Sequence, residues 1–354
     1  MRFGVVGAGV IGRLRAQSVH EQPGADLVGV FDPSREAAEA AVQGTGGRVM
    51  PSLEALLAEG LDVLIVSSPV HHHEEACVLA FEAGVHVLCE KPLSNTVESC
   101  RRIVEAAEQA GRVLAVGFNH RYYPSMKFLK QAVDEGKIGQ LQHVRVFGGH
   151  DGLHNFRADW QYKAPDSGGG AMMDVGIHMT DLARYVVGEI TDVYGVMSNR
   201  VWKVDGSEDD AVAVFRSPEG VPVWYLATWN EWRGYGFYVE AYGDLGMVRG
   251  FYAPMQNLLI THDRPGAPRK KIKKYYPEIM VREKLKSWTS TALLSFKDEL
   301  ADLLRRLQGD ADVALADGYA GLRAVEIAAA VRASTETRQA VQLPALGRMP
   351  AVVR

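Results

Sequence analysis

The stretch FGVVGAGVIG at residues 3–12 decides the fold of this chain of 354 residues. A short apolar run leads into a G-x-G-x-x-G pattern, which opens a segment with helical spacing that reaches about His20. Glycines at these positions permit a tight turn, close approach of the backbone to a pyrophosphate and close packing of helix on strand. Free N–H groups and the dipole of the helix then favour phosphate. The dinucleotide contacts predicted here are Gly7, Gly9, Val10, Ile11 and Gly12.

Asp32 indicates which dinucleotide would bind. It ends the second apolar run, residues 27–31, twenty positions after Gly12. A carboxylate there accepts hydrogen bonds from the 2′-hydroxyl of an adenosine ribose and repels a 2′-phosphate, so NAD is favoured over NADP. Arg35 stands close enough in sequence to soften that preference. The alternative is a glycine-rich turn without a ligand. It is disfavoured because the spacing to Asp32 and the strand and helix on either side of the glycines both fit a dinucleotide site.

The first 120 residues alternate between short apolar runs and helical segments. Runs such as residues 62–66 and 85–89 do not alternate with polar residues, which is typical of strands covered on both faces. Strands separated by helices imply βαβ units and a parallel sheet. We therefore expect a dinucleotide-binding domain over residues 1–120.

Residues 121–354 have a different pattern and are expected to form a second domain, whose last helices pack back on the first. Several longer strands follow one another from residue 190 to 251, which predicts an antiparallel sheet. Residues 254–286 read as a loop that carries a basic run at 269–274. The helices expected here cover residues 125–135, 172–187, 287–307 and 314–333.

Composition excludes several classes of function. The net charge is −4, from 39 basic and 43 acidic residues, so no global basic excess attracts nucleic acid. No run of 18 apolar residues predicts a membrane span, and the chain enters its first apolar run without signal-peptide features. The three cysteines lack the spacing of a disulfide framework or zinc site. We expect a cytoplasmic protein with no nucleic-acid or membrane partner.

Glu90-Lys91-Pro92 is the first candidate for chemistry. It follows the predicted strand at residues 85–89, and ligands of open parallel sheets bind beyond the carboxyl ends of the strands. Lys91 is thus expected where a nicotinamide or substrate would lie, with an extended backbone because Pro92 follows it. The alternative is an ordinary solvated lysine.

The second candidate is GGGAMMDVGIHMTD at residues 168–181. Asp174 and His178 are four residues apart and share one face of the predicted helix, where Asp181 is placed to orient the imidazole. Histidine titrates near neutral pH, which suits proton transfer to and from a hydroxyl. The alternative is that neither residue has a catalytic role: Asp174 is favoured by the dipole at a helix N-terminus, and His178 is a core histidine.

Three motifs, GVVGAGVIG, VLCEKPLS and GGGAMMDVGIHMTD, together resemble the glucose–fructose oxidoreductase, inositol dehydrogenase and MocA family (Gfo/Idh/MocA). Further matches are SSPVHHH, GFN before Arg121 and Tyr122, and the closing VRASTETRQAVQLP. The resemblance implies an α/β chain: an N-terminal Rossmann domain and a C-terminal α+β domain on a large, mostly antiparallel sheet. It also implies a homodimer or homotetramer formed through the open face of that sheet.

The resemblance implies an NAD(H)-dependent oxidoreductase. Its substrate would be the secondary alcohol or ketone of a sugar, sugar derivative or cyclitol such as inositol. Lys91 matches the lysine that contacts substrate and cofactor, while Asp174 and His178 match a substrate-binding aspartate and an acid/base histidine. The further cofactor contacts expected are Ser67, Pro69, His73 and Glu90. The substrate contacts expected are Asn119, Arg121, Arg157 and Trp160.

Other features leave alternatives open. Consecutive histidines at residues 71–73 do not converge on one point, so no metal site is expected. The basic run at 269–274 would grip a phosphorylated or nucleotide-linked sugar, or be a solvated loop. Aromatic residues such as Trp224, Trp229 and Trp232 would stack on a sugar, pack the sheet or line an oligomer face.

Two other functions remain possible on the sequence. One is an enzyme of the same family that holds NAD tightly and uses it transiently, for glycoside cleavage or coupled oxidation and reduction. The other is a non-enzymatic NAD-binding regulatory protein. An intact Lys91, Asp174 and His178 argue against the second, because a sensor needs no acid/base pair.

Overall fold

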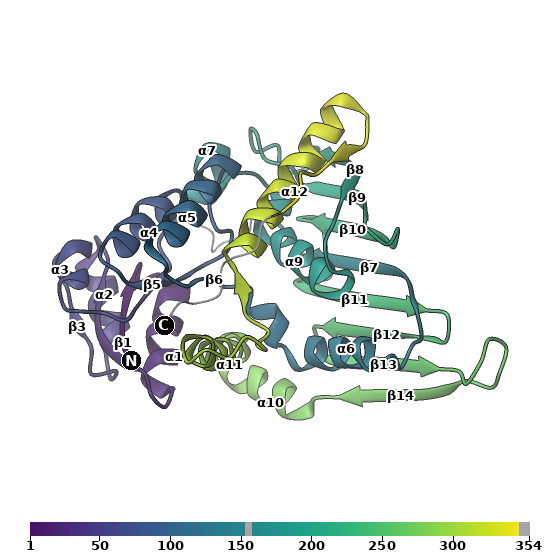
Figure 1. Cartoon of the computed structure of the whole chain (residues 1–354), viewed down its shortest axis with the longest axis horizontal. Coiled ribbons are helices and arrows are strands. Elements are labelled where there is room, and N and C mark those ends of the chain that lie inside the picture. The colour runs from purple at the N-terminus through teal and green to yellow at the C-terminus, as the bar shows by residue number, and fades with distance from the viewer. Residues whose placement is uncertain (153–157, 347–354) are drawn as a thin grey trace. The chain divides into compact units, whose positions relative to one another are not determined.

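A computed structural model describes residues 1–152 and 158–346 of the chain. The described residues divide into two compact units (Figure 1). The first contains Met1–Tyr122 and Lys286–Val325, and the second contains Tyr123–Leu285 and Glu326–Ala345. Among the described residues, no helix is long and apolar enough to cross a membrane.

The first unit is built on a seven-stranded sheet in the order β15-β6-β5-β4-β1-β2-β3. All neighbours pair in parallel except β15, which runs antiparallel to β6. The chain extends from β1 to β2 and β3 on one side and returns to β4 on the other, so the strand order reverses between β1 and β4. The strands are β1 Arg2–Val6, β2 Asp26–Phe31, β3 Arg48–Val49, β4 Val63–Val66, β5 His86–Cys89, β6 Leu114–Val116 and β15 Ala316–Asp317.

Helices cover this sheet, with α1 against α2 and α11, and α4 against α5 (Figure 1). Local signals set their ends: Ser34, Ser52 and Thr96 cap helices by accepting backbone N–H groups, and Gly111 ends one in the left-handed region. The helices are α1 Val10–Glu21, α2 Arg35–Val42, α3 Leu53–Leu57, η1 Val70–His72, α4 His73–Glu82, α5 Val97–Ala110, η2 Asn119–Tyr122 and α11 Thr289–Leu307.

A buried ion network fixes α11 in the first unit. The guanidinium of Arg15, on α1, lies 2.6 Å from a carboxylate oxygen of Glu90 and 2.6 Å from one of Glu299, on α11. It also lies over the ring of Phe296, 3.8 Å from its centroid. Buried charges are tolerated only when paired in this way, so the three groups specify how α11 packs on α1.

The second unit is built on a nine-stranded sheet in the order β14-β13-β12-β11-β7-β10-β9-β8-β16. Only β7 and β10 pair in parallel. Helices α6 and α9 lie along one face (Figure 1), and alternating exposure in β9 and β10 marks the other face as open.

The strands of this sheet are β7 Leu141–Gly149, β8 Asp192–Ser198, β9 Asp210–Arg216, β10 Pro222–Thr228, β11 Gly236–Gly243, β12 Gly246–Tyr252, β13 Gln256–Thr261, β14 Lys270–Tyr275 and β16 Val341–Gln342. The helices that follow residue 122, apart from α11, are α6 Pro124–Asp134, η3 Asp159–Tyr162, α7 Ala164–Ser167, α8 Ala171–Asp174, α9 Gly176–Val187, α10 Pro277–Lys286 and α12 Gly318–Thr337.

The predicted fold class is confirmed, because a parallel α/β sheet precedes a large, mostly antiparallel one. The prediction that residues 254–286 form a loop is wrong, since they contain β13, β14 and α10. Residues 270–274 of the basic run belong to β14, which pairs with β13 over six positions and forms an edge strand with exposed side chains, where lysines are readily accommodated. The central strand β7 was not predicted, and the predicted helix at 172–187 is interrupted at Val175.

Glu299 predicts a pH dependence of stability. Burial raises its pKa from 4.5 to about 7, against the opposing effect of Arg15. Because the folded pKa lies above the unfolded one, the protonated group contributes stability fully below about pH 4.5, and this contribution is lost as the pH rises through about 7. Between about pH 5 and 8, wild type should lose up to about 3 kcal/mol more unfolding free energy than Glu299→Gln.

Urea unfolding at the two pH values measures this difference. Glu39→Gln, which removes an exposed carboxylate on α2, should keep the wild-type dependence. Equal pH dependence in wild type and Glu299→Gln would contradict the prediction.

Candidate active site

The glycine-rich loop has two glycines that the protein needs and one that faces open space. Gly7 has a φ of +88°, and a Cβ there would overlap the backbone of Ser67 and Ser68. A Cβ on Gly12 would overlap the carbonyl oxygen of Gly7. A Cβ on Gly9 would meet no described atom within 4 Å. The first two glycines therefore satisfy packing, whereas the open side of Gly9 has room for a ligand.

The start of α1 fits a bound phosphate. Gly9 is its N-cap, and within the described residues no side chain caps it and its first turn carries no acidic residue. Its first N–H groups and positive dipole thus remain available to an anion. The Oγ of Ser67, which follows β4, is buried and has no hydrogen-bond partner in the described structure. These features fit a dinucleotide at the loop.

Asp32 connects the glycine-rich loop to the start of α2 through hydrogen bonds. One of its carboxylate oxygens accepts a hydrogen bond from the N–H of Ala8 at 2.7 Å, and the other accepts one from Ser34 at 2.8 Å. A carboxylate has further lone pairs, so it can still accept ribose hydroxyls. Arg35 pairs instead with Glu39, with Nε and Oε1 2.8 Å apart.

The loop that carries Lys91 is anchored at Glu90. The Oε1 of Glu90 accepts the Nε–H of Arg15 at 2.7 Å, and its Oε2 accepts the backbone N–H of Lys91 at 3.3 Å. Glu90 was expected among the cofactor contacts. Its carboxylate is instead committed to the protein, because the buried guanidinium beside it requires a counter-charge.

His73 contacts the backbone of the same loop. Its Nε2 lies 2.9 Å from the carbonyl oxygen of Ser68, and its Nδ1 lies 3.1 Å from that of Pro92 and 3.3 Å from the Sγ of Cys89. Burial lowers the pKa of His73 and raises that of Cys89, so both are neutral. A neutral imidazole carries one N–H, which donates either from Nε2 to Ser68 or from Nδ1 to Pro92. His73, also expected to contact the cofactor, is 1% exposed and joins the loops that follow β4 and β5.

The segment after β6 makes contacts with the protein through two predicted site residues. Asn119 donates its side-chain N–H to Ser295 at 2.8 Å, and Arg121 donates to the carbonyl oxygen of Ala314 at 3.0 Å. Both are buried, so these expected substrate contacts hold residues 286–325 in the first unit. His120, between them, was not predicted. Burial, and secondly the charge of Lys91, lower the pKa of His120 to about 3, so it is neutral beside that lysine at neutral pH.

Asp174, in the second unit, is held by two residues that belong to no sequence motif. Its Oδ2 lies 2.9 Å from the Nε2 of His150 and accepts the indole N–H of Trp229 at 3.0 Å. The N–H of Gly152 donates to the Nδ1 of His150, so Nε2 carries the proton and donates to Asp174. His178 is 7% exposed and follows on α9.

Strand register brings His150 and Trp229 together. His150 and Trp229 each follow the last residue of a strand, and those last residues, Gly149 and Thr228, are partners in the parallel pair of β7 and β10. A parallel pair places both carboxyl ends at one edge of the sheet. Trp229 is 2% exposed, so it is a hydrogen-bond donor rather than part of an oligomer face.

Two of the remaining predicted residues lie outside the α-helices and strands. Pro69 precedes η1, and Trp160 lies in η3. Arg157 lies outside the described residues. Within the described part of the chain, no three His, Cys, Asp or Glu side chains are arranged to hold a metal ion.

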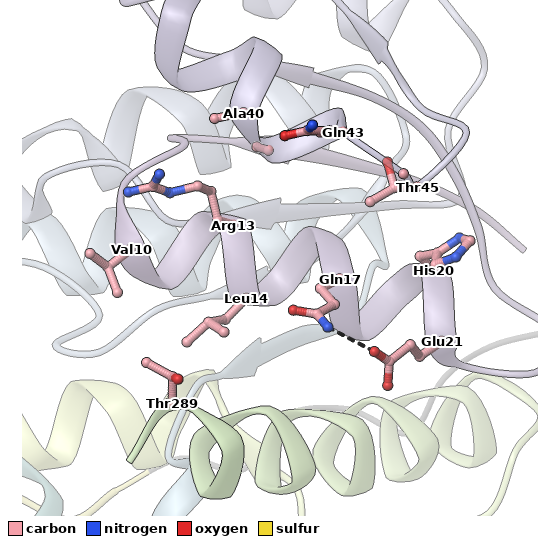
Figure 2. A pocket seen from close by; sticks show the side chains of 12 residues that line it. Val10, Arg13, Leu14, Gln17, His20, Glu21, Ala40, Gln43, Thr45 and Thr289 are labelled. Carbon is pink, nitrogen blue, oxygen red and sulfur yellow. Dashed lines mark hydrogen bonds between the residues drawn. The ribbon is translucent and has the colours of Figure 1, made fainter. Parts of the chain in front are cut away.

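A cavity of about 440 Å³ lies on the outer side of α1 in the first unit. Figure 2 shows its lining from α1, the end of α2 and Thr289, with Gln17 donating to Glu21 at 2.8 Å. Glu21 also pairs with Lys297 at 3.0 Å. Of the predicted cofactor contacts only Val10 lines it, so we assign it no part in the chemistry.

Comparison with known families agrees with these two units. Residues 1–118 match an oxidoreductase family with an NAD-binding Rossmann fold, and residues 126–249 match the GFO/IDH/MocA C-terminal domain. The chain belongs to the Gfo/Idh/MocA family of NAD-binding oxidoreductases. The predicted family and the predicted cofactor NAD are thereby confirmed.

The relatives of this Gfo/Idh/MocA chain include named dehydrogenases. It is 31% identical to inositol 2-dehydrogenase 3 of Saccharopolyspora erythraea over 70% of this chain and 72% of that protein. It is 27% identical to inositol 2-dehydrogenase of Rhizobium meliloti over 96% and 98%. The WlbA dehydrogenase of Bordetella pertussis, solved with NADH and UDP-GlcNAcA, has a TM-score of 0.80 at 26% identity and 98% coverage of both chains.

The loop glycines predict a matched pair of variants. Gly9→Ala should weaken NADH binding by about tenfold or more, because the methyl group enters the space open to the phosphates, while stability stays unchanged. Gly12→Ala should lower the free energy of unfolding by about 1–3 kcal/mol, because its methyl group overlaps the Gly7 carbonyl. NADH titration and urea unfolding measure the two effects, and wild-type NADH affinity in Gly9→Ala would disprove the assignment.

The hydrogen bonds to Asp174 predict that catalysis depends on the indole N–H of Trp229. Trp229→Phe keeps an aromatic ring but removes the N–H that the carboxylate accepts, and should lower kcat/KM for the enzyme's substrate about tenfold or more. Trp224→Phe, on the open face of the sheet, is the matched control and should leave kcat/KM unchanged. The assignment is wrong if the two variants have the same kcat/KM.

Proposed function

We propose that this protein is an NAD(H)-dependent dehydrogenase that oxidises a secondary alcohol of a sugar, sugar derivative or cyclitol, or reduces the matching ketone. The observation that carries the proposal is Asp174, which ends α8 and is held by His150 and Trp229, four residues before His178 on α9. A carboxylate held by two donors binds sugar hydroxyls, and a neighbouring imidazole moves a proton.

Each residue has a distinct part in the proposed mechanism. His178 takes the proton of the reacting hydroxyl during oxidation and returns it during reduction. Lys91 stabilises the developing alkoxide through its charge. Asp174 binds neighbouring hydroxyls and thereby orients the sugar. NAD, when bound, supplies the hydride acceptor at nicotinamide C4.

Supporting residues keep this chemistry in place. Glu90 and His73 hold the backbone on either side of Lys91 in a fixed conformation, so they act as positioning residues. Gly7, Gly9, Val10, Ile11 and Gly12 cradle the pyrophosphate, and Asp32 receives the ribose. In this proposal residues 1–120 hold the dinucleotide and residues 121–354 hold the sugar.

We further propose a cytoplasmic homodimer or homotetramer. The three cysteines are free and buried, which suits a reducing compartment. The open face of the large sheet carries exposed apolar side chains, among them Val212, Val214 and Trp224, as expected of a surface that a second copy covers.

The proposal is tested by incubating the full chain with NAD and inositols, hexoses, glycosides and sugar nucleotides while NADH absorbance is followed. Oxidation of at least one member of the panel is expected. Absence of turnover with every compound, together with absence of NADH binding, would refute it.

Lys91→Ala and His178→Ala should each lower kcat about 10²-fold or more, because one removes the alkoxide's counter-charge and the other the proton acceptor. NADH affinity should stay within about threefold of wild type, since neither group holds the adenosine or pyrophosphate. Lys137→Ala, an exposed lysine paired with Glu135, is the control and should behave as wild type. Near-wild-type kcat in both variants would show that the roles are assigned to the wrong residues.

A further inference from the structure

An exposed indole and a half-buried one form a pair in the second unit. Trp232 is 64% exposed, and its ring centroid lies 6.2 Å from that of Trp202, with 39° between the planes. The exposed indole of Trp232 presents a large aromatic face on which the flat face of a ligand can stack.

Trp232 is joined to the groups that hold Asp174. The loop that carries it leaves β10 at Trp229, whose indole donates to Asp174. Two residues later, the N–H of Glu231 donates to the carbonyl oxygen of His150 at 2.9 Å, and His150 is the other partner of Asp174. Trp232 is the next residue. Both partners of Asp174 therefore fix the start of the loop that presents this indole.

Trp202 is held in place by the same loop. Its indole N–H lies 3.2 Å from the carbonyl oxygen of Trp229 and 3.0 Å from the side-chain oxygen of Asn230. Its ring lies against Gly152, where a Cβ would overlap it. The buried carboxylate of Asp209 accepts its backbone N–H at 3.2 Å. This indole is thus held in a fixed position, and the exposed indole of Trp232 lies beside it.

We propose that Trp202 and Trp232 form an aromatic subsite for the part of the substrate that extends beyond the ring held at Asp174. This inference rests on the proposed dehydrogenase function and adds a substrate class to it: a glycoside, with a second sugar ring or a flat aglycone on the indoles. A pyranose or phenyl ring presents a flat apolar face that stacks on indole, whereas a free monosaccharide or cyclitol ends at the polar subsite.

Charge around the pair favours a small ligand over a protein partner. Glu231 and Arg233 flank Trp232 and pair with each other, with Nε and Oε1 2.7 Å apart. The cores of protein interfaces are depleted of charged residues, whereas a sugar site combines an aromatic face with polar groups.

The test compares each of several monosaccharides with its phenyl glycoside, and inositols alone, as substrates of the full chain with NAD. For wild type, kcat/KM should be about tenfold or more higher for the glycoside of at least one pair. Trp232→Ala should remove that advantage and leave kcat/KM for the monosaccharide unchanged, while Trp232→Phe should retain most of it. Trp288→Ala, an exposed tryptophan in the first unit, is the matched control and should change neither value.

The outcomes separate this subsite from the dehydrogenase function. Oxidation of inositols or monosaccharides without preference for any glycoside overturns the subsite alone. An equal loss on both members of a pair in Trp232→Ala also overturns it, as does an unchanged preference accompanied by a changed oligomeric mass. No oxidation of any compound overturns the proposed function as well.

Discussion

The packing of the first unit depends on the ion pairs made by the buried guanidinium of Arg15. This guanidinium pairs with two carboxyl groups at once, and these come from distant parts of the chain, Glu90 before Lys91 and Glu299 on α11. Taking three ionisable groups out of water is costly, and the cost is offset only while all three are present in this geometry. The network that docks α11 therefore also fixes the backbone from which Lys91 projects.

Local features of the first unit could be predicted from sequence because local chemistry determines them. The G-x-G-x-x-G loop, the carboxylate of Asp32 and the alternation of strands and helices follow from turn sterics and periodicity. Asn119 and Arg121 could not be assigned in this way. Their partners, Ser295 and Ala314, are 176 and 193 residues away, and the same side chains would suit a ligand equally well. Only long-range packing decides between these uses.

The surroundings of Asp174 show the same limit. Asp174 and His178 are visible as a pair because helical spacing places them together, but His150 and Trp229 are 24 and 55 residues from Asp174. They reach it because β7 and β10 are parallel neighbours in a sheet that is otherwise antiparallel. Nothing in the sequence near β7 announces that pairing, so the partners of Asp174 depend on a topology that no short motif encodes.

The edge strand β14 has a consequence for how copies of this chain can associate. An open edge exposes unpaired N–H and C=O groups, to which a strand from another molecule could add without limit. Four of the six residues of β14 are lysines, Lys270, Lys271, Lys273 and Lys274, so a second copy of this strand would set like charges against each other. Electrostatic repulsion thus protects this edge of the sheet without covering it, and edge-to-edge pairing of two copies through β14 is disfavoured.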